Sequence, residues 1–244
     1  MYKATYQIAG AVIQIDSLYE LIHDYCKDYR VDGQADFFVS IKAEDIAFER
    51  EKSDRENELE GLPKQDFSDA YLETLAVYRK IADRMLKRDT LLFHGSAISV
   101  DGRAVLFTAK SGTGKSTHTR LWREAFGQRA VMVNDDKPLL QVLEDQVLVC
   151  GTPWDGKHRL STNCVVPLEA ICILERGEKN EITPISARQA LPMLMQQSHR
   201  PGDPAATALL LQVLDKLTKR MKFYRLKCNM DPEAAQVAYK EMLG

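Results

Sequence analysis

A short segment rich in glycine, lysine and hydroxyl residues constrains the fold of this chain more than any other feature. It reads Ala109-Lys110-Ser111-Gly112-Thr113-Gly114-Lys115-Ser116-Thr117. Glycines allow a tight turn whose successive backbone N–H groups point at one anion, and Lys115 adds a cation for the outer phosphates. The hydroxyl of Ser116 is the expected Mg²⁺ ligand, at the positive end of a following helix. We therefore predict a nucleotide-binding phosphate loop that contacts its ligand through Ser111 to Thr117.

The residues on either side of the segment fit this prediction. Arg103 to Thr108 is a short apolar run typical of a strand, and Thr117 to Phe126 has apolar residues at helical spacing. Ala109 stands where the pattern G-x-x-x-x-G-K-[ST] has its first glycine. Upstream, Asp101-Gly102 between two apolar runs predicts a hairpin of Ala97 to Val100 with the strand that leads into the loop.

A second group of polar residues follows another predicted strand, Ala130 to Val133, and reads Asn134-Asp135-Asp136. Carboxylates at the carboxyl end of a buried strand are positioned to meet a metal ion or an attacking hydroxyl. Neighbouring side chains on an extended backbone point to opposite sides, so the two aspartates can have different roles. An exposed turn is the alternative interpretation of this pair.

Taken together, these motifs resemble the catalytic domain of HPr kinase/phosphorylase and its relatives in the phosphoenolpyruvate carboxykinase-like superfamily. The likeness runs from Phe93-His94-Gly95 through the hairpin and the Walker A loop to Asp135-Asp136. It implies that Lys115 and Ser116 bind phosphate and metal. It also implies that one of Asp135 and Asp136 binds the metal while the other acts on the acceptor proton, with the catalytic residue His94 beside them.

The resemblance weakens downstream. Gly151 to Lys157 and Val166 to Ile171 look like HPr-kinase-like proteins described beside peptide-modification systems. The Arg- and Gly-rich signature with which HPr kinases close their site is missing, which argues against HPr as the acceptor. Lys157, His158 and Arg159 follow a turn-rich segment; Lys157 and Arg159 are candidate catalytic cations for a transferring phosphoryl group, and a solvated basic turn is the alternative. His118, on the helix after the loop, is expected to pack or to support the site.

We predict an α/β (mixed α+β) fold with two regions. Residues 90–244 form an HPr kinase/PEP carboxykinase-like nucleotide-binding core with a mixed sheet and flanking helices. Residues 1–89 form a small α+β region that ends in an amphipathic helix. The elements expected in this first region are strand runs at Tyr2 to Ile15 and Phe37 to Ile41, a helix near Ser17 to Tyr29, a solvated hairpin or loop at Glu49 to Glu60, and the helix Ser68 to Arg88.

The last third of the chain shows hairpin, cap and strand signals. Ala170 to Leu174 and Glu181 to Ile185 flank Gly177 as a hairpin. Ser186 and Gln189 make a capping box for a helix that Pro192 should kink or restart. Aspartate before proline predicts helices over 204–221 and 232–242, with a strand at Phe223 to Cys228 between them.

Composition favours a cytoplasmic enzyme. A net charge of −2 gives no reason to expect nucleic acid or an anionic membrane as partner. The five scattered cysteines are expected to be reduced and packed. Neither a signal peptide nor an apolar segment of membrane-spanning length is recognisable in the sequence.

The sequence thus predicts an ATP-dependent kinase with ATP and Mg²⁺ as cofactors. It would move a phosphoryl group to a hydroxyl acceptor, either a serine or threonine of a peptide or protein or a small metabolite. The alternative is a nucleotide-binding sensor or partner protein without efficient transfer. A decarboxylating carboxykinase would need a second metal and an oxaloacetate clamp, and neither can be located. The acceptor, the donor (ATP, ADP or pyrophosphate) and the oligomeric state, a homo-oligomer included, stay open.

Overall fold

A computed structural model describes residues 1–61, 63–156 and 158–244 of the chain. The chain divides into two compact units, Met1–Arg84 and Met85–Gly244. None of the helices in the described part of the chain is long and apolar enough to cross a membrane.

The first unit contains a three-stranded sheet in the order β1-β2-β3. Its strands are β1 (Tyr2–Ile8), β2 (Ala11–Ser17) and β3 (Phe37–Ser40). The run from Tyr2 to Ile15 is therefore a hairpin, because Ala9 and Gly10 turn the chain with φ of 48° and 74°. The predicted helix after β2 is reduced to α1 (Leu21–Tyr25) and a turn of 3₁₀ helix at Lys27–Tyr29.

The charged stretch from Glu49 to Glu60 is helical, and the prediction of a hairpin or loop there was wrong. It forms most of α2 (Ala43–Glu60), which precedes α3 (Asp69–Met85). Glutamate, lysine and arginine are good helix formers even without an apolar period, and ion pairs from α3 hold this helix. Arg79 Nε lies 2.5 Å from Oε1 of Glu49, and Lys80 Nζ lies 2.6 Å from Oδ2 of Asp45.

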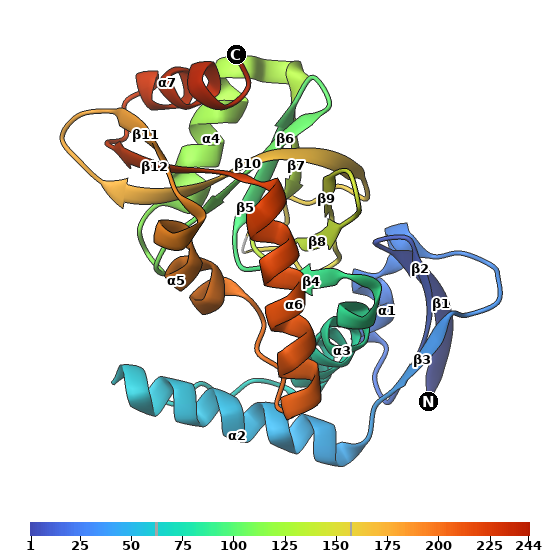
Figure 1. Ribbon diagram of the computed structural model, residues 1–244. Coiled ribbons are helices and arrows are strands. Elements are labelled where there is room, and N and C mark those ends of the chain that lie inside the picture. Colours follow the sequence, from blue (N-terminus) through green and yellow to red (C-terminus); the bar gives the residue numbers. More distant parts are fainter. Residues whose placement is uncertain (62, 157) are drawn as a thin grey trace. The chain divides into compact units, whose positions relative to one another are not determined.

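The second unit is built on a nine-stranded mixed sheet (Figure 1). Its strands are β4 (Thr90–Leu92), β5 (Ser96–Val100), β6 (Arg103–Thr108), β7 (Ala130–Asn134), β8 (Leu139–Val142), β9 (Val147–Cys150), β10 (Val165–Arg176), β11 (Glu181–Ile185) and β12 (Lys222–Cys228). Its helices are α4 (Lys115–Phe126), α5 (Ala187–Gln197), α6 (Pro204–Arg220) and α7 (Glu233–Met242), with 3₁₀ turns at Leu86–Arg88 and Gly127–Arg129. The strands run in the order β4-β8-β9-β10-β6-β5-β7, while β12 pairs with β10 and β11.

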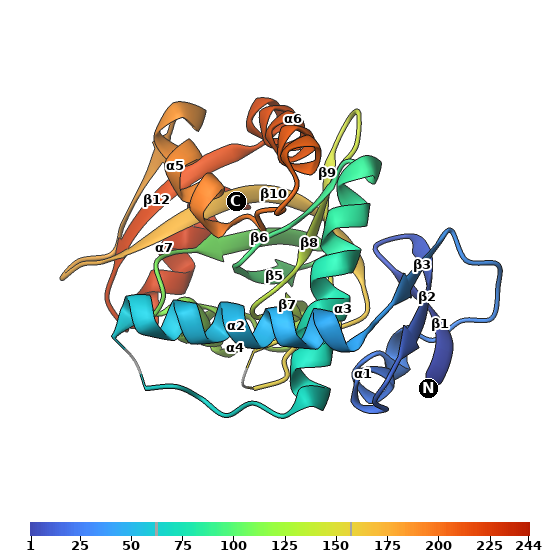
Figure 2. The same ribbon diagram turned by 90° about the horizontal axis from the view of Figure 1, so that it is seen from below.

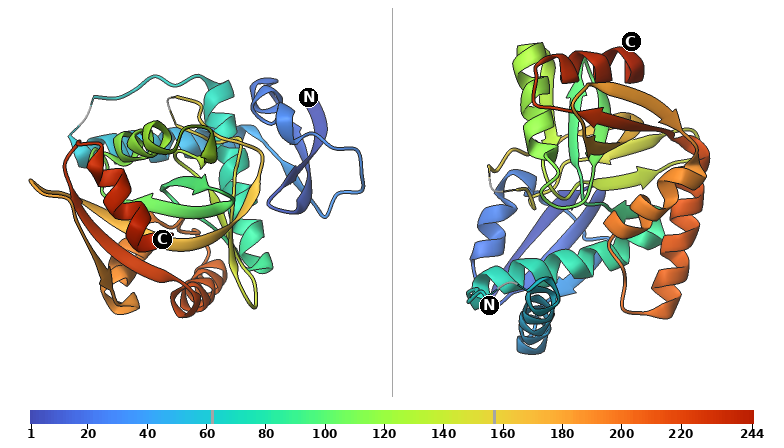
Figure 3. Two further views of the ribbon diagram at one scale, coloured as in Figure 1. Left: turned by 90° about the horizontal axis from the view of Figure 1, so that it is seen from above. Right: turned by 90° about the vertical axis from the view of Figure 1, so that its left-hand side faces the viewer.

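Helices cover both faces of this sheet. Figure 2 shows α5 and α6 on one face, and Figure 3 shows α4 and α7 side by side on the other. Strand β6 is buried on both faces, and its side chains alternate between two cores: Ala104 and Leu106 pack toward α5 and α6, whereas Val105 and Phe107 pack toward α4 and α7. The structure thus confirms a mixed α/β fold with flanking helices.

One edge of the sheet collects the ends of four strands. Strands β6 and β12 pair parallel to β10, and both β6 and β7 pair antiparallel to β5. The carboxyl ends of β7, β6, β10 and β12 therefore meet at the same edge, together with the start of β5. Ligands of open α/β sheets bind in the crevice at this edge.

Most predicted elements around this edge are confirmed. The β5–β6 hairpin turns at Asp101 and Gly102 with φ of 52° and 79°, and α4, α6, α7 and β12 lie within two residues of their predicted bounds. The hairpin of β10 with β11 was wrong, because β12 lies between them and pairs with both. Helix α5 begins at the Ser186 capping box and continues through Pro192 to Gln197, because its buried residues Ala190 and Leu194 hold both halves in the core.

Candidate nucleotide-binding site

The segment Lys110 to Gly114 forms a turn between β6 and α4, as the sequence predicts. Gly112 and Gly114 have φ of +72° and +119°, conformations that L side chains rarely adopt. A Cβ atom at either position would meet nothing within 4 Å, so the backbone here is open to a ligand. Thr113 Oγ1 donates to the carbonyl of Lys110 at 2.8 Å and stiffens the turn. An open glycine turn at a helix start fits a phosphate group.

Ala109, the departure from the usual pattern, is accommodated without strain. Its φ is not positive, and its methyl group is buried in the core beneath α4. The turn begins one residue later, so this position does not need the conformational freedom of glycine. The departure therefore leaves the shape of the loop intact.

Lys115 is half-buried at the start of α4. Its Nζ donates to the carbonyl of Ala109 at 3.4 Å. Burial lowers the pKa of Lys115, and the nearby carboxylate of Asp136 opposes that shift. A half-buried ammonium group beside an open glycine turn is suited to holding phosphate oxygens. The next residue, Ser116, is exposed and its hydroxyl is free to reach a ligand.

Asp136 lies next to His94, which precedes β5. Oδ1 of Asp136 is 3.2 Å from Nε2 of His94, and each side chain is about one third exposed. Burial acts to raise the pKa of Asp136, but the hydrogen bond from His94 and the charges of Lys137, His94 and Lys115 outweigh it, so the pKa is lowered. The backbone fixes the pair, because the N–H of Gly95 donates to the carbonyl of Asp136 at 3.0 Å. A side chain at Gly95 would press on Leu106, which explains the glycine.

Asp135 has the opposite environment. It is only 5% exposed, and its Oδ1 accepts a hydrogen bond of 2.7 Å from the backbone N–H of Gly156. Burial raises its pKa, the Gly156 N–H opposes the shift, and the neighbouring carboxylates Asp155 and Asp136 add to it. A Cβ at Gly156 would lie 2.8 Å from Oδ2 of Asp135, so the absence of a side chain lets this loop lie against the carboxylate. Adjacent aspartates whose pKa values are moved in opposite directions suit different chemical roles.

A buried amide holds the turn that carries both aspartates. Oδ1 of Asn134 accepts from the backbone N–H groups of Asp136 and Lys137 at 2.9 and 2.6 Å, and its Nδ2 donates to the carbonyls of Thr152 and Trp154 at 3.2 Å each. Thr152 Oγ1 closes the arrangement by donating to the carbonyl of Lys137 at 2.8 Å. Asn134, Thr152 and Lys137 have no predicted role. The turn-stabilising role of Asn134 could have been predicted from its place before the two aspartates, since Asn side chains stabilise such turns. Nothing in the local sequence indicates a role for Thr152 or Lys137.

His118 packs inside the second unit. It is 2% exposed, its ring meets Phe107 edge-on at 4.5 Å, and its Nε2 accepts the indole N–H of Trp122 at 3.1 Å. Burial lowers the pKa of His118 to about 4, so the ring is neutral at neutral pH. This agrees with a packing role on the helix that follows the loop.

The remaining predicted residues lie on the loop that covers Asp135. His158 and Arg159 are exposed there, Arg159 has a φ of 50°, and its N–H donates to the carbonyl of Gly156 at 3.0 Å. Lys157, the other candidate cation, lies outside the described residues. The structure thus brings Lys115, Asp135, Asp136 and His94 to one edge and places the loop of Arg159 beside Asp135.

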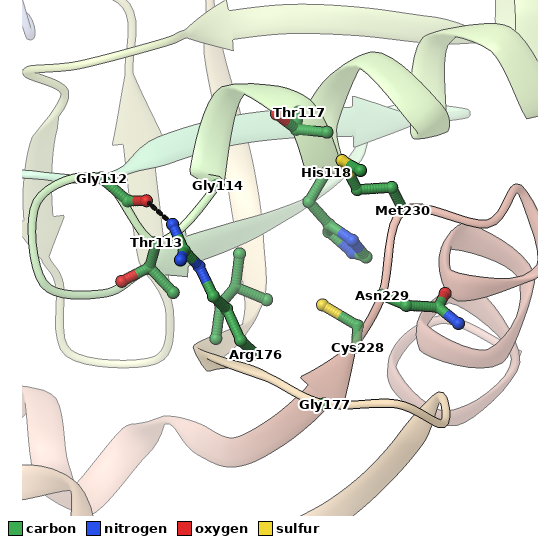
Figure 4. A pocket seen from close by; sticks show the side chains of 11 residues that line it. Gly112, Thr113, Gly114, Thr117, His118, Arg176, Gly177, Cys228, Asn229 and Met230 are labelled. Carbon is green, nitrogen blue, oxygen red and sulfur yellow. Dashed lines mark hydrogen bonds between the residues drawn. The ribbon is translucent and has the colours of Figure 1, made fainter.

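A cavity of about 500 Å³ adjoins the phosphate loop on its other side (Figure 4). Residues 112–114 of the loop form one wall, and the ends of β10 and β12 form the others. Arg176 at the end of β10 donates from Nη2 to the carbonyl of Gly112 at 2.7 Å. The sequence predicts no role for Arg176, since a single arginine after a strand is no signal by itself.

The residues at this edge fit a magnesium–nucleotide complex. The open loop backbone and Lys115 can hold phosphate oxygens, and the Ser116 hydroxyl with one carboxylate can bind Mg²⁺. Within the described residues, no three His, Cys, Asp or Glu side chains come together as a metal site. Because Mg²⁺ takes one or two carboxylates plus phosphates and water, a sparse protein ligand set suits it.

Comparisons with known proteins add a family and a distant similarity to a solved structure. A family model described as SynChlorMet cassette protein ScmC matches residues 62–232. No curated protein matches the sequence. The structure of the Hpr(Ser) kinase/phosphatase from Coxiella burnetii is similar with 11% sequence identity and a TM-score of 0.35, over 62% of this chain and 96% of that chain. A score of this size is too low to support an argument about fold or function.

Proposed function

The chain belongs to the SynChlorMet cassette protein ScmC family, and from the chemistry of its site we propose that it is an ATP-dependent kinase acting on a hydroxyl group. The acceptor is a serine or threonine of a peptide or protein, or a small hydroxylated metabolite. One observation carries the proposal: Lys115 at the mouth of an open glycine loop lies within electrostatic reach of Asp136, and Asp135 precedes Asp136 on the same turn.

Phosphoryl transfer depends on positioning and charge neutralisation more than on covalent chemistry. In the proposed site the loop backbone from Ser111 to Thr117 and the Lys115 ammonium bind the phosphate chain. Ser116 and Asp136 hold Mg²⁺, which when bound neutralises the charge of the phosphates. We assign neutralisation of the charge on the transferring group to Arg159 or Lys157, the candidate cations of the sequence after Gly156.

The division of roles between the two aspartates follows from their surroundings. A metal ligand must remain ionised, and the pKa of Asp136 is lowered beside His94 and the charge of Lys115. A general base works best when its pKa is nearer the working pH, and burial raises the pKa of Asp135. We therefore assign Asp136 to the metal, with His94 orienting it, and Asp135 to the acceptor hydroxyl. Asp135 takes the hydroxyl proton as the oxygen attacks the γ-phosphorus, and the bond between that phosphorus and the β,γ-bridging oxygen breaks to release ADP.

Label transfer tests this function. Purified protein is incubated with γ-labelled ATP, Mg²⁺ and a lysate of its own host, and label on protein and on small molecules is measured separately. We expect transfer by the wild type and none by Lys115→Ala, because this half-buried lysine directly follows the glycine turn at the start of α4. Lys110→Ala, which removes an exposed lysine of the same loop, is the matched control. Tight ATP binding without transfer to any acceptor would instead assign the protein to the nucleotide sensors.

A further inference from the structure

The cavity beside the phosphate loop lies away from the aspartates. Across the sheet edge, Asp135 and Asp136 follow β7, His94 precedes β5, and the loop follows β6. The cavity is formed beyond the loop, at the ends of β10 and β12. A molecule whose phosphates occupy the loop, with its terminal phosphate toward the aspartates, therefore has its other end at this cavity.

One wall of the cavity carries a buried hydrogen-bond donor that has no acceptor. The indole nitrogen of Trp122 can only donate, so Nε2 of His118 is the acceptor of their 3.1 Å hydrogen bond and the ring proton is on Nδ1. That Nδ1–H is buried and has no partner among the described residues. A buried donor without a partner is costly, and a ligand acceptor in the cavity would remove the cost.

The rest of the lining suits a flat aromatic group. The side chains of Leu174, Cys228 and Met230 contribute carbon and sulfur, and Figure 4 shows His118, Cys228 and Met230 around one space. Met230 is 75% exposed, so a ring bound in the cavity would cover apolar surface of its side chain. Thioether sulfur makes favourable contacts with aromatic rings. Arg176, held on the Gly112 carbonyl, adds a cation where the loop meets the cavity.

We infer that this cavity is the nucleoside subsite of the phosphate donor, with the base lying between Met230 and Cys228 and an acceptor atom of the nucleoside near His118. The inference rests on the proposed function and deepens it, because it assigns the nucleoside of the ATP donor to named residues of this cavity. The size agrees: ligand pockets are typically about 300–1,000 Å³, and this cavity of about 500 Å³ is continuous with the phosphate loop. Inorganic phosphates would leave it unused.

Binding of two ligands that share a phosphate chain tests the inference. Calorimetric titration compares Mg·ATP with Mg·tripolyphosphate for the wild type, Cys228→Phe, which fills the cavity, and Met230→Ser, which removes the exposed thioether. Leu211→Ser, an exposed apolar residue of α6, is the matched control. Tripolyphosphate binding also shows that the loop of each variant is folded.

We expect the wild type to bind ATP at least about 10-fold more tightly than tripolyphosphate. Cys228→Phe should bring the two affinities together, and Met230→Ser should weaken ATP alone by about 2- to 10-fold. Leu211→Ser should change neither. Equal affinities in the wild type, or an ATP preference that survives both variants, would overturn the subsite. Failure of the wild type to bind either ligand would instead overturn the phosphate loop and with it the proposed function.

Discussion

The two sides of the phosphate loop share one sheet edge but are built differently. On the aspartate side, Asn134 and Thr152 fix the turn with short hydrogen bonds, and backbone groups of Gly95 and Gly156 hold the aspartates. On the cavity side, Met230 is mostly exposed and the Nδ1–H of His118 has no partner in the described chain. Satisfied buried networks rigidify a site, whereas unpaired groups are left for a ligand to complete.

The aspartate side and the cavity side of the loop need different physical properties. Transfer chemistry demands fixed geometry, because misplacement of a reacting group by about 1 Å can cost 100-fold in rate. Holding a nucleoside demands only a cavity and a few directed polar groups. We therefore expect substitutions on the aspartate side to act on turnover or metal use, and substitutions on the cavity side to act on nucleotide affinity or on the stability of the protein.

The largest effect is expected from Asp135→Asn. The amide can still accept the Gly156 N–H, so the turn should survive, but it cannot take a proton from the acceptor. Turnover should fall by about 100- to 10,000-fold with ATP affinity unchanged. Steady-state rates of label transfer and calorimetric ATP binding measure the two. Asp145→Asn, an exposed carboxylate in the β8–β9 turn, is the control; an unchanged rate for Asp135→Asn would remove this residue from the chemistry.

The next largest effect is expected on the stability of the folded protein in acid, through His118 on the cavity side. Burial lowers the pKa of His118 to about 4 in the folded protein, against 6.5 when unfolded. The unfolded chain therefore takes the proton first, so stability is full above pH 6.5, falls as pH drops toward 4 and levels off below it. The loss amounts to about 3 kcal/mol.

Urea unfolding of the wild type and His118→Gln between pH 7 and 4 measures this contribution. The variant should lose that part of the pH slope, although its stability at neutral pH is lower because the packing against Phe107 changes. Identical slopes in the two proteins would mean that His118 titrates normally, and would contradict a buried neutral ring.

A smaller effect is expected from Asp136→Asn. If this residue holds Mg²⁺ while Asp135 serves the acceptor, the Mg²⁺ concentration for half-maximal rate should rise by about 10-fold or more. Turnover at saturating Mg²⁺ should change far less than in Asp135→Asn. Mg²⁺ titrations of label transfer provide the comparison. The reverse pattern, with Asp135→Asn altering the metal requirement and Asp136→Asn altering turnover, would exchange the two roles.

Local signals predicted much of this edge. The glycine spacing of residues 112 and 114, the Asp101-Gly102 turn and the caps at Ser186 and Asp203 are set by neighbours along the chain, and the structure has each of them. Ala109 was harder to interpret, because only the structure shows that its position needs no positive φ. The roles of the predicted site residues remain predictions.

Contacts between residues far apart in the sequence limited how much of the remaining fold and site could be predicted. The order β10-β12-β11 cannot be derived from the sequence, because a hairpin and a three-strand arrangement give the same local pattern. Helix α2 lacks an apolar stripe, and its stability depends on ion pairs with α3. Thr152, Gly156 and Arg176 form hydrogen bonds with partners 15, 21 and 64 residues away. No local sequence pattern therefore indicates their roles.

The most direct test of the two-sided site is a crystal structure of the protein with Mg²⁺ and a non-hydrolysable ATP analogue. We expect the triphosphate in the loop at Gly112 to Ser116, the γ-phosphate toward Asp135 and Asp136, and the base in the cavity against Met230. A base lying beside the aspartates, or a triphosphate bound away from Lys115, would contradict it.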